Sequence, residues 1–243
     1  MDEITLIAEK DAKSPVAEAY RTIRTNIQFS QTEKELRTIV LTSATPNEGK
    51  STTISNLAVV MAQAGHKVVV MDCDFRNPTQ HKLFKLHNKG LSNSIATGSD
   101  VMEVMQESGI ENLCVLTSGP VAPNPSELLA SERMNAVLEK LKEQFDYVLV
   151  DAPPIMPVTD AAVIAGKVDG VILLIEAGSV SPNVAKEAKA RMEQGGGHIL
   201  GVVLNKVDVA SRHYGYGYGY GYGYYYGTEE KGKEKKKRQA IHG

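Results

Sequence analysis

The fold can be predicted from one stretch, Leu36–Ala58, whose sequence is LRTIVLTSATPNEGKSTTISNLA. Its first part, LRTIVLTSA, is an apolar run rich in β-branched residues, and such a run predicts a buried strand. A loop containing Pro46 and Gly49 comes next. From Lys50 onward, KSTTISNLAVVMAQAG predicts a helix that ends at Gly65. The stretch is therefore a strand, a loop and a helix in succession.

The same alternation continues along the chain. Further strands are predicted at residues 66–74, 112–119, 145–154, 168–178 and 198–208. Helices are predicted at residues 14–30, 125–145, 159–167 and 181–194, whereas residues 75–110 suggest short helices at most. Continuous apolar strands that alternate with helices are typical of an α/β fold with a mostly parallel sheet covered on both faces. Ligands of such sheets bind beyond the carboxyl ends of the strands.

The loop ATPNEGKST, residues 44–52, fits the phosphate-loop pattern G-x-x-x-x-G-K-[ST] except that Ala44 replaces the first glycine. A triphosphate needs inward-pointing backbone N–H groups, a helix N-terminus, a lysine and a hydroxyl for Mg²⁺. An ordinary turn is the alternative, and the position between a buried strand and a helix argues against it. The predicted nucleotide-binding residues are Pro46, Asn47, Glu48, Gly49, Lys50, Ser51 and Thr52.

Carboxylates end two further strands at the same predicted edge. Asp151, in YVLVDAPP, is placed to hold Mg²⁺ through water, or else to cap the next turn. Asp72 and Asp74, in VVVMDCDFRNP, lie on one face of an extended chain with Cys73 opposite. Their mutual repulsion raises one pKa unless a cation intervenes. A bound Mg²⁺ would relieve this repulsion, or one aspartate could accept a proton from an attacking hydroxyl. The alternative is that one of the two aspartates is functional and the other structural.

Two other residues are candidates for ligand contacts. Arg76 can reach a phosphate or pair with a carboxylate, and the sequence leaves both open. The stretch VVLNKVD, residues 202–208, has the N-K-x-D form that binds guanine in many GTPases. We expect Asn205 to contact a nucleotide base, with a turn residue as the alternative, and we do not infer GTP from it.

Composition and charge are those of an ordinary globular chain, with 243 residues, 42% hydrophobic and 23% charged content and a net charge of −2. The run EEKGKEKKKR, residues 229–238, is a solvated tail or a contact for acidic lipid or an acidic partner. No apolar run approaches a membrane span, and the N-terminus lacks the features of a secretory signal. Cys73 and Cys114 have no metal-like spacing. We expect a cytoplasmic protein.

The C-terminal part, HYGYGYGYGYGYYYG at residues 213–227, holds eight of the ten tyrosines. Each glycine costs roughly 0.5–1 kcal/mol in a strand relative to alanine, which disfavours an ordered sheet here. We expect a flexible tail, which when extended reaches about 60 Å from Asp208 to Tyr226. An adhesive or structural repeat is the alternative.

Together, TSATPNEGKSTTISNLA, VVVMDCDFRNP, YVLVDAPP, the helix EAYRTIRTN and this tail resemble the bacterial tyrosine kinases of capsule and exopolysaccharide systems. The resemblance implies a P-loop NTPase fold shared with partition ATPases, ATP and Mg²⁺ as cofactors, and regulation of polysaccharide synthesis and export. It implies Lys50, Asp72, Asp74 and Asp151 as catalytic residues, and Ser51, Asp72 and Asp151 as metal ligands. It also implies autophosphorylation between subunits at Tyr214, Tyr216, Tyr218, Tyr220, Tyr222, Tyr224, Tyr225 and Tyr226.

The resemblance further concerns assembly and partners. The family's E-x-x-R-x-x-R helix, which packs subunits into a ring, corresponds to Glu18, Arg21 and Arg24; the alternative is a solvated helix face. In some members of the family the membrane segment is a separate protein that activates the kinase, and the resemblance implies such an activator here. It also implies a tyrosine phosphatase and other cytoplasmic proteins as substrates. No nucleic acid is expected. The implied division is an N-terminal helical segment at 1–35, a kinase domain at 36–210 and a tyrosine-rich tail at 211–243.

Two other functions compete with a kinase. One is a nucleotide switch of the partition or division-site class, which needs neither the tyrosine tail nor the EAYRTIR helix. The other is a GTPase-like module based on NKVD. Within the kinase hypothesis, we expect Asp72 to be the base because it lies deeper in its strand, with Asp74 as the second candidate.

Overall fold

A computed structural model describes residues 6–30 and 35–208. Its centre is one sheet with the strand order β3-β4-β2-β5-β1-β6-β7. All neighbouring pairs are parallel except β3 and β4, which are antiparallel. The strands are β1 (Thr38–Ser43), β2 (Val68–Asp72), β3 (Gln106–Glu107), β4 (Leu113–Leu116), β5 (Tyr147–Asp151), β6 (Gly170–Glu176) and β7 (Ile199–Asn205).

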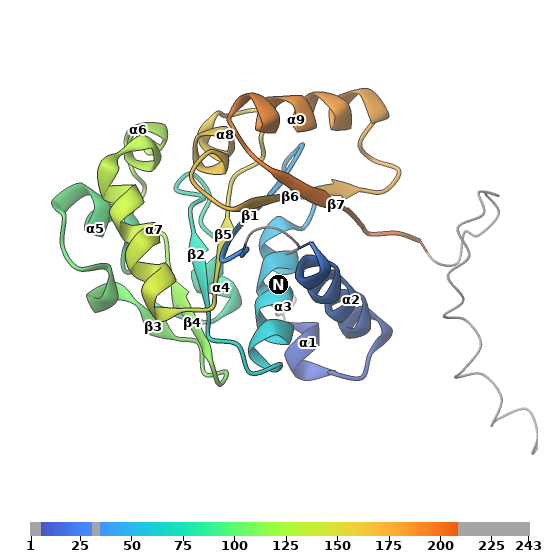
Figure 1. Ribbon diagram of the computed structural model, residues 1–243, viewed down its shortest axis with the longest axis horizontal. Helices are drawn as coiled ribbons and strands as arrows, with labels where there is room; N and C mark the ends of the chain where they lie inside the picture. Colours follow the sequence, from blue (N-terminus) through green and yellow to red (C-terminus); the bar gives the residue numbers. More distant parts are fainter. Residues whose placement is uncertain (1–5, 31–34, 209–243) are drawn as a thin grey trace, which may run out of the picture. The chain divides into compact units, whose positions relative to one another are not determined.

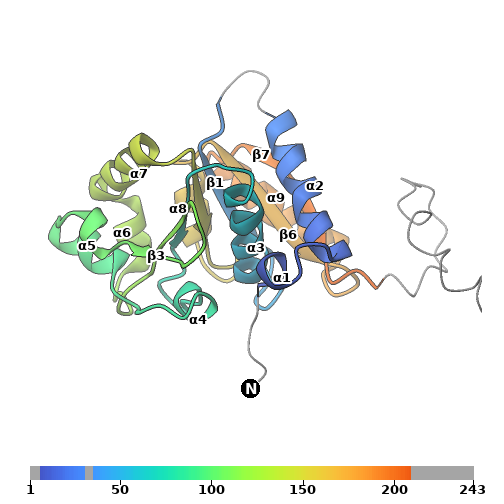
Figure 2. The same cartoon turned by 90° about the horizontal axis from the view of Figure 1, so that it is seen from below.

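Helices cover both faces of this sheet, as Figures 1 and 2 show. One hydrophobic cluster packs the sheet against α1, α2, α3 and α4, and the other packs it against α5 to α9. The helices are α1 (Ile7–Lys10), α2 (Pro15–Phe29), α3 (Lys50–Ala62), α4 (Gln80–Leu83), α5 (Leu91–Thr97), α6 (Pro125–Ala130), α7 (Glu132–Gln144), α8 (Asp160–Ala165) and α9 (Pro182–Gln194), with a 3-10 helix at Val101–Val104.

The central strands are buried along their whole length, which explains their unbroken apolar sequence. Every residue of β1, β2 and β5 is shielded from solvent. Parallel strands covered on both faces have no polar face to present to water. The prediction of an α/β fold with a mostly parallel sheet and helices on both faces is confirmed.

The helix α3 follows the predicted loop directly and packs under the sheet. Its N-cap is Gly49 in the left-handed conformation, and most of its residues are buried. Because α3 is buried on nearly all sides, including several of its polar residues, it is a core helix rather than a surface one. The strand-loop-helix prediction for this region is confirmed.

Three features differ from the sequence expectation. The helix expected at 125–145 is two helices, because Ser131 is extended and its side chain accepts the N–H of Met134 as the N-cap of α7. Residues 75–110 contain two short α-helices, the 3-10 helix and the antiparallel edge strand β3. The short helix α1 was not anticipated. Within residues 6–30 and 35–208, no helix combines the length and apolarity needed to cross a bilayer.

Candidate active site

The predicted residues meet at the carboxyl edge of the sheet. Asp151 of β5 is in register with Asp72 of β2 on one side and with Leu41 of β1 on the other. A pocket of about 510 Å³ opens there. Its lining residues are Pro46, Asn47, Gly49, Lys50, Ser51, Thr52, Asp74, Arg76, Asn77, Thr79, Pro153, Pro154, Pro157 and Val158. Six of the seven predicted phosphate-loop residues therefore line one cavity.

The loop has the backbone of an anion-binding turn. Asn47 and Gly49 have φ angles of 64° and 95°. The positive φ of Gly49 favours glycine, and a Cβ there would lie 2.4 Å from Nδ2 of Asn205 and displace that side chain. Lys50 begins α3 at the pocket, where the partial positive charge of the helix N-terminus adds to its own. The arrangement attracts phosphate.

Contacts from β6 and β7 hold this loop from behind. The carboxylate of Glu48 is buried, and it accepts hydrogen bonds from Thr45 and from the backbone N–H of Glu176, the latter at 2.7 Å. Asn205 donates from Nδ2 to the Glu48 carbonyl at 2.7 Å. Lys206 donates from Nζ to the Asn47 carbonyl and pairs with Glu176, both at 2.8 Å. Glu48 and Asn205, both expected to contact nucleotide, thus place their side chains on the loop itself.

Asp72 and Asp74 have different environments, in contrast to the expectation that they share one face of an extended chain. The strand β2 ends at Asp72, and the chain bends because Oδ1 of Asp72 accepts the N–H of Asp74 at 3.1 Å. Oδ2 of Asp72 accepts the N–H groups of Thr79 and Gln80, each at 3.0 Å. Asp72 is fully buried away from the pocket, whereas Asp74 lines it.

Asp151 is fully buried and only half satisfied. Its Oδ2 accepts a hydrogen bond from Nε2 of Gln80 at 2.8 Å. Its Oδ1 has no hydrogen-bond partner among the described residues. A buried, unpartnered carboxylate oxygen is costly unless a ligand satisfies it. No group of three His, Cys, Asp or Glu side chains suited to a metal occurs in the described part of the chain. The oxygens of Asp151 and Ser51, with water, fit Mg²⁺.

The acidic groups here are hard to ionise while no cation is present. Burial raises the pKa of Asp151 to about 6, although the nearby Ser51 hydroxyl and the Gln80 amide partly oppose the effect. Burial, and then the charge of Asp151, raises the pKa of Asp72 well above its ordinary value. Burial also raises the pKa of Asp74, against the effect of Lys50. Raised carboxylate pKa values in a pocket are typical of catalytic sites.

Arg76 pairs with a carboxylate at the rim of the pocket. Its Nε and Nη2 donate to the two oxygens of Asp160 at 2.8 and 3.1 Å, and Ser126 also donates to Asp160. Asp160 is fully buried, while the Arg76 side chain remains 44% exposed and lines the pocket. The sequence left open whether Arg76 contacts a phosphate or pairs with a carboxylate, and in the structure it pairs with Asp160.

An apolar part of the pocket lining is anchored to the sheet. It consists of Pro153, Pro154, Pro157 and Val158. The hydroxyl of Thr42 donates to the Pro153 carbonyl at 2.7 Å, and the N–H of Ile155 donates to the Ser43 carbonyl at 2.9 Å. These bonds tie the segment after β5 to the end of β1, the strand that leads into the phosphate loop.

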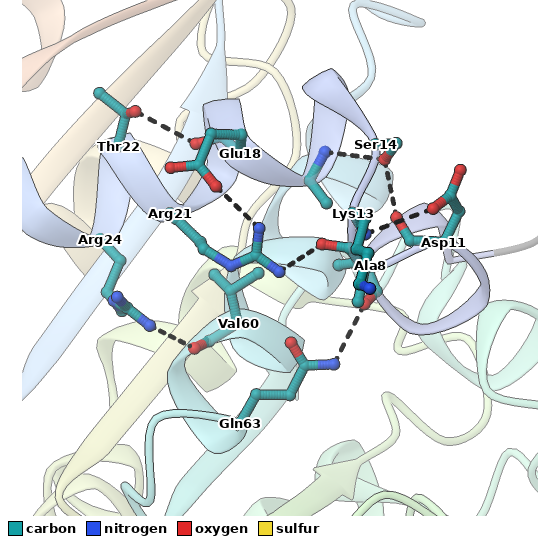
Figure 3. A network of polar contacts seen from close by, with 12 residues as sticks. Ala8, Asp11, Lys13, Ser14, Glu18, Arg21, Thr22, Arg24, Val60 and Gln63 are labelled. Atoms are coloured by element: carbon teal, nitrogen blue, oxygen red, sulfur yellow. Dashed lines mark hydrogen bonds and ion pairs between the residues drawn. The ribbon is translucent and has the colours of Figure 1, made fainter. Parts of the chain in front are cut away.

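The expected interface residues lie on α2, and Figure 3 shows their contacts. Arg21 pairs with Glu18 at 2.9 Å and also donates to the Ala12 carbonyl. Arg24 donates from Nη1 to the Val60 carbonyl of α3 at 3.0 Å, and its buried Nε has no partner among the described residues. Both arginines thus make contacts within the chain. An interface between subunits stays a prediction.

One residue that touches the phosphate-loop helix and both buried aspartates was not anticipated. Gln80 contacts Ser51, Asp72 and Asp151, yet it lies within residues 75–110, where the sequence suggested short helices at most. A glutamine carries no motif, and only its position after the Asp72 loop could have drawn notice. The tail tyrosines at 214–226 lie outside the described residues.

The chain matches known proteins along most of its length. Residues 36–183 match a family model described as an AAA domain. The tyrosine-protein kinase YwqD of Bacillus subtilis is 41% identical over 201 residues, which are 82% of this chain and 85% of YwqD.

Two solved structures have the same architecture. The chimerical protein CapA2B2 has a TM-score of 0.80 at 39% identity, covering 83% of this chain and 89% of that one. The kinase domain of the Escherichia coli tyrosine kinase ETK has a TM-score of 0.82 at 37% identity, covering 90% and 86%. Both the sequence and the fold are thus similar to those of proteins named as tyrosine kinases.

Proposed function

The chain belongs to the bacterial tyrosine-protein kinases of the capsule polysaccharide family, and we propose that it transfers the γ-phosphoryl group of ATP to tyrosines of its own C-terminal tail on a neighbouring subunit. The observation that carries this proposal is the pocket that Lys50, Ser51 and Asp74 line together. A phosphate-binding lysine and a carboxylate with a raised pKa thus line the same cavity.

Phosphoryl transfer depends mostly on positioning and on neutralising charge. Lys50 and the backbone N–H groups of the loop hold the outer phosphates. Ser51 and Asp151 are the proposed ligands of Mg²⁺, which when bound neutralises charge on the β- and γ-phosphates. Asp72, whose two oxygens accept three backbone N–H groups, braces the segment that carries Asp74. The earlier expectation that Asp72 binds the metal is not needed in this scheme.

Asp74 is the proposed base, in place of Asp72. It lines the pocket, whereas Asp72 does not. Asp74 accepts the proton of the tyrosine hydroxyl as the phenol oxygen bonds to the γ-phosphorus and ADP leaves. The raised pKa of Asp74 brings its proton affinity closer to that of the tyrosine hydroxyl, which suits a general base. The apolar wall of Pro153, Pro154, Pro157 and Val158 suits the flat face of the tyrosine ring.

The tail supplies the acceptors in this proposal. Eight tyrosines lie between residues 214 and 226, separated mostly by glycine. An extended chain of that length after Asp208 spans about 60 Å, enough to reach another subunit. Glu18, which is exposed, together with Arg21 and Arg24 is the proposed contact between subunits.

A membrane protein is the proposed activator, and it would recruit the kinase to the membrane. The similarity of this chain to a protein described as chimerical, CapA2B2, supports such a partner. A tyrosine phosphatase and other proteins are proposed as further substrates, with no nucleic acid among the partners. Control of capsule polysaccharide synthesis and export is the proposed outcome.

The test mixes two variants of the full chain with Mg²⁺ and ATP. A Lys50→Met chain keeps its tail but should bind phosphate poorly, and a chain with its eight tail tyrosines replaced by phenylalanine keeps its pocket. We expect mass spectrometry to find phosphotyrosine on the Lys50→Met tail only in the mixture. Labelling of Lys50→Met alone would contradict the role of the lysine. If the wild-type tail is labelled but the Lys50→Met tail stays unlabelled in the mixture, transfer between subunits is contradicted.

A further inference from the structure

Gln80 lies at the start of α4, fully buried beneath the pocket and not among its lining residues. It therefore touches neither nucleotide nor acceptor in the proposed site. A buried glutamine is uncommon unless its amide is satisfied, because an unpaired amide in the interior is costly. Its partners show what it holds.

The side-chain amide of Gln80 joins two elements of the site. Nε2 donates to Oδ2 of Asp151 at 2.8 Å and to the carbonyl of Ser51 at 3.3 Å. Oε1 accepts the hydroxyl of Ser55 at 2.6 Å. The backbone N–H of Gln80 donates to Asp72 at 3.0 Å. One residue thus bonds to the phosphate-loop helix and to both buried aspartates.

These contacts fix the orientation of the amide. Rotating it by 180° would place Oε1 against the Asp151 carboxylate and the Ser51 carbonyl, so that acceptors would face acceptors. With Nε2 on Asp151, one carboxylate oxygen is occupied and the other is left over. The leftover oxygen is Oδ1, the buried atom without a partner among the described residues.

We propose that Gln80 is a positioning residue for Mg²⁺, because it fixes the Asp151 carboxylate with Oδ2 on the amide and Oδ1 available to the cation. It acts through Asp151 and through the carbonyl of Ser51, the residue whose hydroxyl is the other proposed ligand. The inference rests on the proposed function, in which Ser51 and Asp151 hold the metal. Residues that orient metal ligands typically contribute 10- to 100-fold to metal affinity.

The test measures ADP binding to the full chain by calorimetry, once with Mg²⁺ and once with a chelator. The Gln80→Met variant keeps the approximate shape of the side chain and loses the amide. We expect the enhancement of ADP affinity by Mg²⁺ to fall about 10- to 100-fold, with ADP affinity in chelator unchanged. A residue that only supports the fold would lower both affinities alike.

The matched control is Gln63→Met. Gln63 also carries an amide that bonds across the chain, to the Ala8 carbonyl at 3.1 Å, but it touches neither aspartate. Its variant should keep the full effect of Mg²⁺. A second variant, Gln80→Leu, also removes the amide, with a shorter apolar side chain; it should lose the effect as Gln80→Met does.

The outcomes separate this inference from the proposed function. A folded Gln80→Met or Gln80→Leu chain with the wild-type response to Mg²⁺ would overturn the inference. Unfolding of both variants would also overturn it, because Gln80 would then be needed for the stability of the core. If Asp151→Asn also keeps the full response to Mg²⁺, the proposed metal site itself is wrong. If Asp151→Asn loses it while folded Gln80 variants keep it, only the role of Gln80 falls.

Discussion

At the level of single residues, the buried carboxylates have a measurable consequence for stability. Asp72 and Asp151 lie in register on neighbouring strands, and neither is exposed. Burial raises the pKa of Asp151 to about 6 from an ordinary 3.8. Between these two pH values the folded chain binds more protons than the unfolded chain, so stability falls as the pH rises through this window.

The corresponding variant is Asp151→Asn. Without Mg²⁺ at about pH 7.5, we expect it to be more stable than wild type by up to about 3 kcal/mol, because the ionised carboxylate is no longer buried. At about pH 4.5 the difference should shrink, since the wild-type carboxyl is then protonated. Urea denaturation in chelator at both pH values measures this.

Asp100→Asn is the control, because the pKa of Asp100 is lowered in the folded chain rather than raised. Its ion pair with Lys140 lowers the pKa of Asp100, so removing the charge should not stabilise the chain at neutral pH. Equal stability of Asp151→Asn and wild type at both pH values would show that burial does not destabilise the ionised form of Asp151.

A second prediction distinguishes the two aspartates near the pocket. Asp74→Asn removes the proposed base and should lower the rate of tyrosine phosphorylation by about 10²- to 10⁴-fold, with ADP affinity little changed. Because a base must be ionised, the wild-type rate should fall as the pH drops through the raised pKa of Asp74. Steady-state kinetics over a pH series, together with ADP titration, provide the measurement.

Asp72→Asn serves as the comparison. An amide has only one acceptor oxygen and cannot accept all three backbone N–H groups that the Asp72 carboxylate accepts, so the loop that carries Asp74 should loosen. If Asp74→Asn retained the wild-type rate while Asp72→Asn lost the rate and kept its stability, Asp72 would be the base, as its depth in the strand first suggested.

At the level of elements, the end of β7 holds the phosphate loop. Asn205 and Lys206 donate to the carbonyls of Glu48 and Asn47 at 2.7 and 2.8 Å. The N-K-x-D form in the sequence suggested a contact with a nucleotide base, and the structure shows a contact with the loop. These two roles predict different effects on nucleotide choice.

The variant Asn205→Ala tests them. If Asn205 supports the loop, ADP and GDP affinities should fall by the same factor, about five- to tenfold for one lost hydrogen bond. Lys206→Met should act in the same direction, because it removes the neighbouring bond. Fluorescence titration with both nucleotides measures the ratio. A change in the ratio of ADP to GDP affinity for Asn205→Ala alone would favour a base contact.

The elements also show how far the sequence leads. Strands β1, β2, β5 and β6 and helix α3 follow from apolar runs and one loop, since burial on both faces leaves a strong pattern. The break between α6 and α7 was missed because Ser131 is a modest helix former whose capping role depends on local geometry. Gln80 and the Glu48–Glu176 contact join residues far apart in sequence, and no local pattern encodes such pairs.

At the level of the whole molecule, charge connects catalysis to assembly. The chain carries a formal net charge of −2, and eight of its tyrosines lie between residues 214 and 226. Each phosphotyrosine adds about −1.5 to −2 charges, so complete modification adds on the order of −12 to −16. Subunits that meet through Glu18, Arg21 and Arg24 would then repel one another through their tails.

We therefore expect ATP with Mg²⁺ to reduce the size of the assembly as the tail is modified, and to do so more at low salt than at high salt, because salt screens repulsion between exposed charges. Light scattering before and after the reaction, with mass spectrometry of the tail, measures both quantities. The chain with its eight tail tyrosines changed to phenylalanine binds the same nucleotide but gains no charge there, so its assembly should keep its size. An equal decrease in that control would assign the effect to nucleotide binding, and an unchanged wild-type assembly at full modification would exclude repulsion between tails as the force that separates subunits.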